Sequence, residues 1–187
     1  MTGLPADVLP EQIETPRLIV RVARPGDGAM FNEAVVESLP QLSPWLGWVT
    51  PPPTLAQSEA SCRRAYARFL LNEDLMALFL RKADGALVGG SGLHHANWTL
   101  RQFEVGYWGR SRDAGQGLVT EGVRALADHA LSVLRATRVY LTTDARNEAS
   151  CRLAERAGFA LEGTLRNERL DLQGVLRHTR VYARVPG

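Results

Sequence analysis

A glycine-rich turn that joins a strand-like run to a long amphipathic helix most constrains how this chain of 187 residues folds. The turn, Arg112-Asp113-Ala114-Gly115-Gln116-Gly117, follows the run Phe103–Trp108. Beyond the turn, apolar residues recur at the three- and four-residue spacing of a helix with one buried face. We predict a helix over about 115–134. This helix connects the strand before the turn to a later strand that runs parallel to it. The recurring residues are Val119, Val123, Leu126, Ala130 and Val133.

The predicted turn has the properties of an anion-binding site. The first N–H groups of a helix lack partners within the helix and carry a partial positive charge, and glycines let a phosphate approach the backbone. We predict a pyrophosphate cradle with a charge-assisted hydrogen bond from Arg112; an ordinary glycine turn is the alternative. The spacing matches neither the dinucleotide fingerprint nor a P-loop. The predicted cradle residues are Arg112, Asp113, Ala114, Gly115, Gln116, Gly117 and Leu118.

Composition is that of a soluble globular protein with a single domain. Apolar residues make up 45% and charged residues 22% of the sequence, which is ordinary for this class. The formal net charge of +2 is too small to indicate nucleic-acid binding. Cys62 and Cys151 form no Cys-x-x-Cys motif, which argues against a zinc site and fits a reducing compartment. With neither an apolar run of about 18 residues nor a signal peptide, we expect a cytoplasmic protein without a membrane partner.

The order of periodic segments predicts an α/β (α+β) architecture, with a mixed central sheet of about seven strands and about four helices on its faces. Residues 1–12 are expected to form a flexible N-terminal arm, and residues 13–187 a single domain. The expected strands are 17–23, 75–82, 86–93, 103–108, 137–143, 159–165 and 174–184, and the expected helices are 27–38, 55–71, 115–134 and 148–158.

Several local signals fix the ends of these segments. Asp27 is placed to cap the first helix. Thr54 and Gln57 form a capping box before the second helix, and Asp84-Gly85 predicts a hairpin turn. Gly158 is placed to end the last helix in a left-handed conformation.

At this level of detail the chain resembles the GCN5-related N-acetyltransferases (GNAT), and within them the RimJ/RimL type of ribosomal-protein N-terminal acetyltransferase. The resemblance covers about residues 13–185. It rests on the order of elements, on Arg112-x-x-Gly115-x-Gly117 after the fourth strand and on Asn147-x-x-Ser150 after the fifth. Further matching stretches are Glu14-Thr-Pro-Arg-Leu18, Trp45-Leu-Gly-Trp48, Glu104-Val-Gly-Tyr-Trp108, Thr120-Glu121 and Ala157-Gly-Phe-Ala-Leu-Glu-Gly163.

The resemblance implies acetyl-CoA as donor, no metal, and direct transfer of the acetyl group to an amine. In this family the fourth and fifth strands splay apart, and the pantetheine arm inserts between them. The backbone from Trp108 to Arg110 is then expected beside the thioester, where an N–H group can stabilise the oxyanion. Asn147 is expected to hydrogen-bond the cofactor arm; a plain helix N-cap is the other interpretation, and the two roles can coexist.

The resemblance also implies a base and an acid. Glu104 is the first candidate base, since Gly106 and Trp108 share its side of the predicted strand; a cross-strand ion pair is the alternative. Glu168 is a rival base. Ser150 is the candidate proton donor to the leaving thiolate, because Ala154 stands after Leu153 where many members carry a tyrosine. A capping role is the alternative for Ser150.

Three residues are assigned to the acceptor side. Trp45 and Trp48 lie in the loop that borders the acceptor cleft in this family, although core packing alone would also explain them. His94 is expected to line the acceptor side or to pack outward. Adjacent strand residues point to opposite faces, so His94 and His95 cannot chelate one metal ion together.

The leading functional hypothesis is acetylation of a protein N-terminal amine, such as that of a ribosomal protein. One alternative is acetylation of a small amine such as a polyamine, an amino acid or an antibiotic. A second alternative is a non-catalytic acyl-CoA-binding domain. The sequence leaves both a monomer and a homodimer open.

Overall fold

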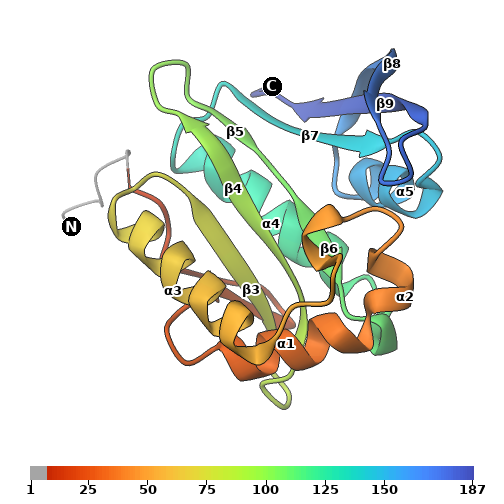
Figure 1. Cartoon of the computed structure of the whole chain (residues 1–187). Coiled ribbons are helices and arrows are strands. Elements are labelled where there is room, and N and C mark those ends of the chain that lie inside the picture. The colour runs from red at the N-terminus through yellow and green to blue at the C-terminus, as the bar shows by residue number, and fades with distance from the viewer. Residues whose placement is uncertain (1–7) are drawn as a thin grey trace, which may run out of the picture.

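Nine strands of residues 8–187, the part of the chain that the structure describes, form one mixed sheet in the computed structural model (Figure 1). Neighbouring strands follow the order β1-β2-β3-β4-β5-β7-β9-β8, and β6 pairs with β4 beside this path. The predicted fold class is confirmed, with nine strands rather than about seven. The strands are Gln12–Glu14 (β1), Leu18–Val22 (β2), Leu75–Arg81 (β3), Leu87–Asn97 (β4), Gln102–Glu104 (β5), Tyr107–Gly109 (β6), Arg138–Asp144 (β7), Ala160–Leu170 (β8) and Leu176–Arg184 (β9).

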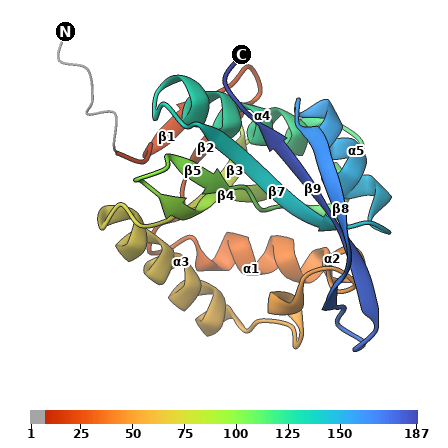
Figure 2. The same cartoon turned by 90° about the horizontal axis from the view of Figure 1, so that it is seen from above.

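Helices cover both faces of the sheet (Figure 2). On one face lie α4 and α5, and Val123 of α4 belongs to the same buried cluster as Phe79 and Phe103 of the sheet. On the other face lie α1 and α3, where Phe31 packs with Trp108. No helix within residues 8–187 is long and apolar enough to cross a membrane. The helices are Gly28–Glu37 (α1), Leu39–Leu42 (α2), Leu55–Leu70 (α3), Leu118–Ser132 (α4) and Glu148–Arg156 (α5), with 3-10 turns at Gly47–Val49 (η1) and Ser111–Asp113 (η2).

Local sequence signals explain most of the element ends. The capping box of α3 is confirmed: Thr54 Oγ1 accepts from the Gln57 N–H at 3.2 Å, and the Thr54 N–H donates to Gln57 Oε1 at 2.8 Å. Gly158, with φ +90°, follows the last residues of α5 as predicted. The prediction that the Asp27 side chain caps α1 is wrong. Its carboxylate instead accepts from the Arg24 N–H at 2.7 Å and pairs with Arg21 at 2.6 Å.

The run predicted as a single strand over 103–108 is two short strands, β5 and β6, separated at Val105-Gly106. β5 pairs with β7 in parallel, whereas β6 pairs with β4. The Val105 N–H donates to Tyr140 O at 2.7 Å, and Ser91 Oγ donates to Gly106 O at 2.7 Å. Beyond this break β6 and β7 part, so the expected splaying of the fourth and fifth predicted strands is confirmed. The parallel pairing of β5 with β7 also confirms the predicted crossover through α4.

The structure differs from the prediction at several places, among them the N-terminal arm, strand β1 and the end of α4. Leu9, placed in the flexible arm, is buried and its N–H donates to Asn72 Oδ1 at 2.9 Å; residues 1–7 of that arm lie outside the described residues. Strand β1 has only three residues, too few for an alternation of buried and exposed side chains to be recognised in the sequence. Val133, predicted on the buried face of the long helix, is 42% exposed because α4 ends at Ser132, and Leu134 is buried in its place.

Candidate active site

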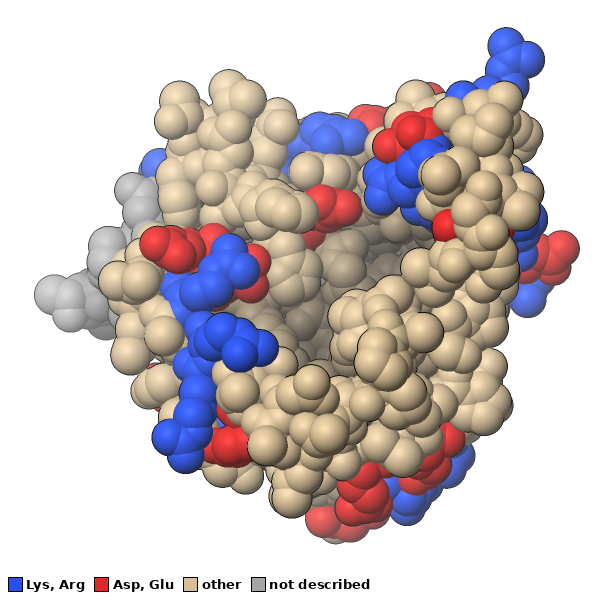
Figure 3. All heavy atoms as spheres, viewed as in Figure 1, with Lys and Arg blue, Asp and Glu red and all other residues tan. Residues whose placement is uncertain are grey.

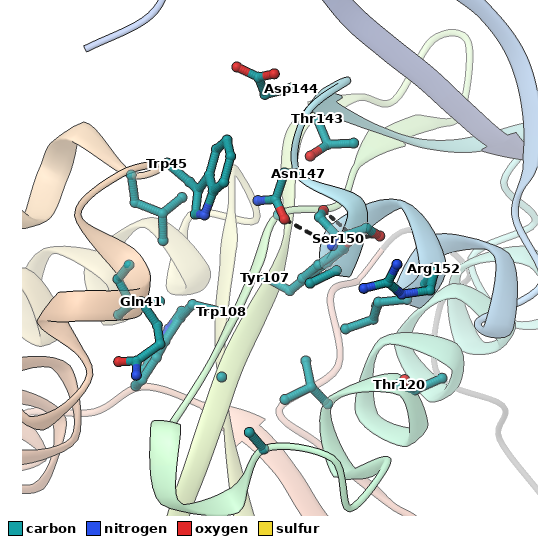
Figure 4. Close-up of a pocket in the computed structure, with 18 of the residues that line it drawn as sticks. Gln41, Trp45, Tyr107, Trp108, Thr120, Thr143, Asp144, Asn147, Ser150 and Arg152 are labelled. Atoms are coloured by element: carbon teal, nitrogen blue, oxygen red, sulfur yellow. Dashed lines mark hydrogen bonds between the residues drawn. The ribbon is translucent and has the colours of Figure 1, made fainter. Parts of the chain in front are cut away.

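A cavity of about 600 Å³ opens where β6 and β7 part. Figure 3 shows this face of the molecule hollowed near its centre. In the close-up of Figure 4, Trp45, Gln41 and Trp108 lie on one side, and Asn147 and Ser150, at the start of α5, lie on the other, with Tyr107 of β6 near Ser150. The cavity therefore lies at the splayed strands, where the sequence predicted a ligand site.

The glycine turn forms one end of this cavity. Gly115 and Gly117 have φ of +78° and +74°, a left-handed conformation that favours glycine. Gly117 is the N-cap of α4 and offers no side-chain acceptor, so the first N–H groups of α4 lack partners in the helix. A Cβ at Gly115 would meet no atom within 4 Å. This open backbone concavity at a helix N-terminus fits a bound phosphate.

Arg17 holds the glycine turn from the N-terminal strands. Its Nη1 donates to Gln116 O at 3.0 Å, and its Nε pairs with Glu121 at 2.6 Å. Glu121 also accepts from the Arg17 N–H at 2.9 Å and from Thr15 Oγ1 at 2.5 Å. The turn is thus fixed by contacts outside the cavity, and its backbone remains available to a ligand.

The arginines beside the turn form ion pairs with carboxylates of α1. Arg112 Nε donates to Glu37 Oε1 of α1 at 2.8 Å, and Arg112 is not among the described residues that line the cavity. Arg110 is buried, pairs with Glu37 at 2.7 Å and with Glu33, and lines the cavity. Asp113 pairs with Arg81 at 2.8 Å. In this conformation only backbone could form the predicted cradle, and the predicted Arg112 contact to a phosphate would require Arg112 to leave Glu37.

Glu37→Gln tests how far this ion-pair cluster holds β6 against α1. Hydrogen bonds from Arg112 and Arg110 lower the pKa of Glu37 to about 2. A depressed folded-state pKa contributes stability above the unfolded value of about 4.3, and that stability is lost as the pH falls toward 2. We expect the variant to unfold roughly 5 °C lower at pH 7, and the difference to shrink between about pH 5 and pH 2. Thermal unfolding across this range measures it, and a difference independent of pH would contradict this account.

Ser150 and Tyr107 form a hydroxyl pair in the wall of the cavity. Tyr107 Oη lies 2.9 Å from Ser150 Oγ and donates to Ser150 O at 3.0 Å. Burial raises the pKa of Tyr107 to about 12, so the phenol keeps its proton at neutral pH. The sequence predicted Ser150 but not Tyr107. The missing signal is the packing of α5 onto β6, which brings the two hydroxyls together.

Asn147 is the N-cap of α5, and its Oδ1 accepts from the Ser150 N–H at 3.0 Å. Figure 4 shows the other end of this amide turned away from the helix, toward the Trp45 side of the cavity. The capping role predicted as an alternative therefore belongs to Asn147, and it leaves the Asn147 amide within the cavity wall.

The two candidate carboxylate bases have different surroundings. Glu104 Oε2 lies 2.8 Å from His95 Nδ1, and Glu104 Oε1 accepts from Thr142 Oγ1 at 3.3 Å. Thr142 lines the cavity. The strand break means that Glu104 no longer shares a continuous strand with Trp108, which corrects the argument from alternation. Glu168 is held by Arg169 and by Thr179 at 2.8 Å, and these hydrogen bonds lower its pKa to about 2. Such a carboxylate is a weak base.

The three residues predicted on the acceptor side have different surroundings in the structure. Trp45 lines the cavity. Trp48 stacks on Phe31 with ring centroids 6.0 Å apart and packs edge-on against Trp108 at 6.5 Å, the packing role considered as its alternative. His94 Nδ1 lies 3.0 Å from Asp74 Oδ1.

Sequence reasoning missed four arginines that line the cavity. Arg152 and Arg156 lie one helical turn apart on α5, and Arg169 and Arg177 lie on β8 and β9. The four-residue spacing of the first two was the available signal. Asp144, a lining carboxylate, pairs with Arg146 at 2.7 Å and with Arg177 at 3.7 Å.

A family model described as an acetyltransferase (GNAT) domain matches residues 17–160. The chain is 30% identical over 169 residues to the protein named "Putative ribosomal N-acetyltransferase YdaF" of Bacillus subtilis (strain 168), and the match covers 88% of each chain. It is 26% identical over 135 residues to the ribosomal-protein-serine acetyltransferase of Escherichia coli (strain K12), covering 71% of this chain and 75% of that protein.

Among solved structures, a RimL ribosomal L7/L12 alpha-N-protein acetyltransferase in complex with coenzyme A matches with a TM-score of 0.86 and 20% identity. The match covers 94% of this chain and 98% of that chain, and it shows a shared fold. The family model spans most of the chain and includes both the glycine turn and the Tyr107–Ser150 pair. The protein therefore belongs to the acetyltransferase (GNAT) family.

Proposed function

We propose that this acetyltransferase modifies the α-amine of a peptide or protein N-terminus, of the ribosomal-protein type. The names of two curated relatives support this acceptor. The observation that carries the proposal is the set of arginines in the cavity at the end away from the glycine turn. Figure 4 shows Trp45 and Asp144 at that end. Arg177 lies 3.7 Å from Asp144, Arg169 is opposite Arg177 in the β8–β9 register, and both arginines line the cavity.

These arginines favour a peptide over a polyamine. The Asp144 carboxylate is already paired with Arg146 and Arg177, and the hydrogen bonds from Arg146 lower its pKa. Arg169 is paired with Glu168 and Arg177 with Asp144, so a polycation would have to compete with these two arginines for both carboxylates. The two arginines can instead donate to the carbonyl or carboxylate oxygens that follow the first amine of a peptide.

The donor end of the cavity fits acetyl-CoA, which supplies the acetyl group as an activated thioester. The backbone around Gly115 and Gly117 would hold the pyrophosphate at the start of α4. Arg152 and Arg156 of α5 line the same cavity and can neutralise further phosphate charge. The Asn147 amide is placed to hydrogen-bond the pantetheine arm.

At the reacting centre the chain has to accept one proton and donate another. We assign donation to the Tyr107–Ser150 pair, since the two hydroxyls lie 2.9 Å apart in the cavity wall. On the acceptor side, Glu104 is joined through Thr142 to the cavity. Glu104 therefore stays a candidate for one of two roles. It receives the ammonium proton itself, or it stabilises another group that receives this proton.

A direct comparison of acceptors tests the proposal. We expect kcat/KM for acetylation of short peptides with a free N-terminus to exceed that for spermidine by at least about a hundredfold, which equals about 2.8 kcal/mol in transition-state stabilisation. Release of CoA thiol at saturating acetyl-CoA measures both rates. Equal or higher kcat/KM for spermidine would identify a small-amine acetyltransferase instead.

A further inference from the structure

We infer that His94, positioned by Asp74, is the group that takes the proton from the acceptor ammonium. This inference rests on the proposed function and adds a residue pair to its chemistry. His94 and Asp74 lie on β4 and just before β3, on the face of the sheet that carries α1 and α3. The hydroxyl pair Tyr107–Ser150 lies across the strand break from them.

The first observation is the contact between the two side chains. His94 Nδ1 lies 3.0 Å from Asp74 Oδ1 and 3.1 Å from Oδ2, and the Asp74 side chain is 10% exposed. A carboxylate this close to Nδ1 accepts its N–H and so fixes the neutral tautomer. The lone pair of the neutral ring is then on Nε2.

The second observation is where Nε2 lies. A Cβ at Gly106 would be 3.7 Å from His94 Nε2 and 3.6 Å from Cδ2. Gly106 lines the main cavity at the break between β5 and β6. A Cβ at Gly92, by contrast, would overlap the imidazole, so glycine at this position is what allows the ring to lie along β4. The basic nitrogen thus borders the point where β6 and β7 part.

The third observation is the set of charges that face the ring. Glu104 is directly opposite His94 in the β4–β5 register and lies 2.8 Å from the Nδ1 of His95. From α3, Arg68 lies 3.4 Å from Asp74 Oδ2, and Arg64 lines the same surface depression as His94. Two carboxylates and two guanidinium groups therefore surround the ring, and Asp74 is the one that contacts its Nδ1.

The fourth observation is a route for the proton. His94 is not among the described residues that line the main cavity; it lines a second, open cavity of about 510 Å³, together with Asp74, Met76, His95 and residues of α3. In the step we propose, an ammonium N–H bond breaks and an Nε2–H bond forms, which leaves the amine lone pair free to attack the thioester. The imidazolium then releases its proton to water in the second cavity.

Kinetics of His94→Gln, Asp74→Asn and the control His129→Gln in the full chain test this inference. We expect His94→Gln to lower kcat by about a hundredfold with unchanged affinity for acetyl-CoA, and to abolish the acid limb of the pH profile of kcat/KM. Asp74→Asn is expected to lower kcat about tenfold, since the lost carboxylate no longer holds the ring in the tautomer that leaves Nε2 unprotonated. His129→Gln removes an imidazole of α4 that is not among the described residues lining either cavity, and it should stay within about threefold of the wild type.

Nitrogen-15 NMR of the His94 ring in the free protein gives a second readout. We expect the Nδ1–H tautomer in the wild type and its loss in Asp74→Asn. A His94→Gln enzyme with wild-type kcat and pH profile, or a wild-type ring protonated at Nε2 alone, would overturn the inference. If the wild type acetylates spermidine in preference to peptides, the proposed acceptor is wrong, and the same variants then test the base on spermidine.

Discussion

Gly117→Trp is expected to weaken acetyl-CoA binding by at least about a hundredfold, or about 2.8 kcal/mol. Gly117 caps α4 with φ +74°, and the only atom within 4 Å of a Cβ built there is Arg17 Nη2, at 3.7 Å. An indole at this position would occupy the space where the pyrophosphate approaches the backbone N–H groups. Isothermal titration calorimetry with acetyl-CoA measures the loss.

The matched control for this variant is Gly85→Trp. Gly85 has φ +71° and open space around its Cβ position, but it lies in the turn between β3 and β4 and is not among the described residues that line the cavity. Both variants place a tryptophan in the left-handed conformation, so their melting temperatures should fall by similar amounts. Unchanged acetyl-CoA affinity in Gly117→Trp, or an equal loss in Gly85→Trp, would contradict the cradle.

Removing either hydroxyl of the Tyr107–Ser150 pair is expected to slow turnover without weakening acetyl-CoA binding. We expect Tyr107→Phe and Ser150→Ala each to lower kcat by roughly ten- to a hundredfold. The double variant should be little worse than the more impaired single variant, because the two hydroxyls, 2.9 Å apart, act as one proton donor. Tyr66→Phe is the matched control, since this phenol stacks on Phe69 within α3.

Single-turnover rates with calorimetric binding constants distinguish this role from a structural one. A proton donor changes the rate of transfer and leaves the dissociation constant of acetyl-CoA within about twofold. Additive losses in the double variant would indicate two independent contributions. Wild-type kcat in both single variants would show that the pair donates no proton and that Ser150 has only a structural role in the first turn of α5.

The sequence predicted those parts of the fold that depend on nearby residues. Thr54 and Gln57 are three positions apart and form their capping box as expected, and the apolar spacing after Gly117 is sufficient to identify α4. Gly158 ends α5 for the same local reason. The glycine turn could be placed at the mouth of a cavity because a strand and a helix flank it in the chain.

What the sequence could not predict depends on partners far along the chain. The break at Val105-Gly106 is fixed by the carbonyl of Tyr140 and the hydroxyl of Ser91, which belong to other strands. Arg112 was assigned to the pyrophosphate from its place beside the glycines, but its guanidinium meets Glu37, 75 residues earlier.

Tyr107 illustrates the same limit within the site. It stands inside the run Glu104–Trp108 that carried the family resemblance, yet nothing in that run marks it as functional. Its role becomes visible only when α5 brings Ser150, 43 residues later, to its hydroxyl. The proposed proton-donating pair is a contact between two elements, whereas the proposed cradle is a property of one turn.

The most direct test of the account is the position of the acetyl group on a peptide that offers two amines. The peptide carries a free N-terminus and one internal lysine, and it is incubated with acetyl-CoA and the enzyme at neutral pH. We predict that tandem mass spectrometry will find a single acetyl group on the α-amine, formed at a rate that Gly117→Trp abolishes. Acetylation of the lysine ε-amine alone, or no enzyme-dependent acetylation while spermidine is modified, would contradict the proposed function.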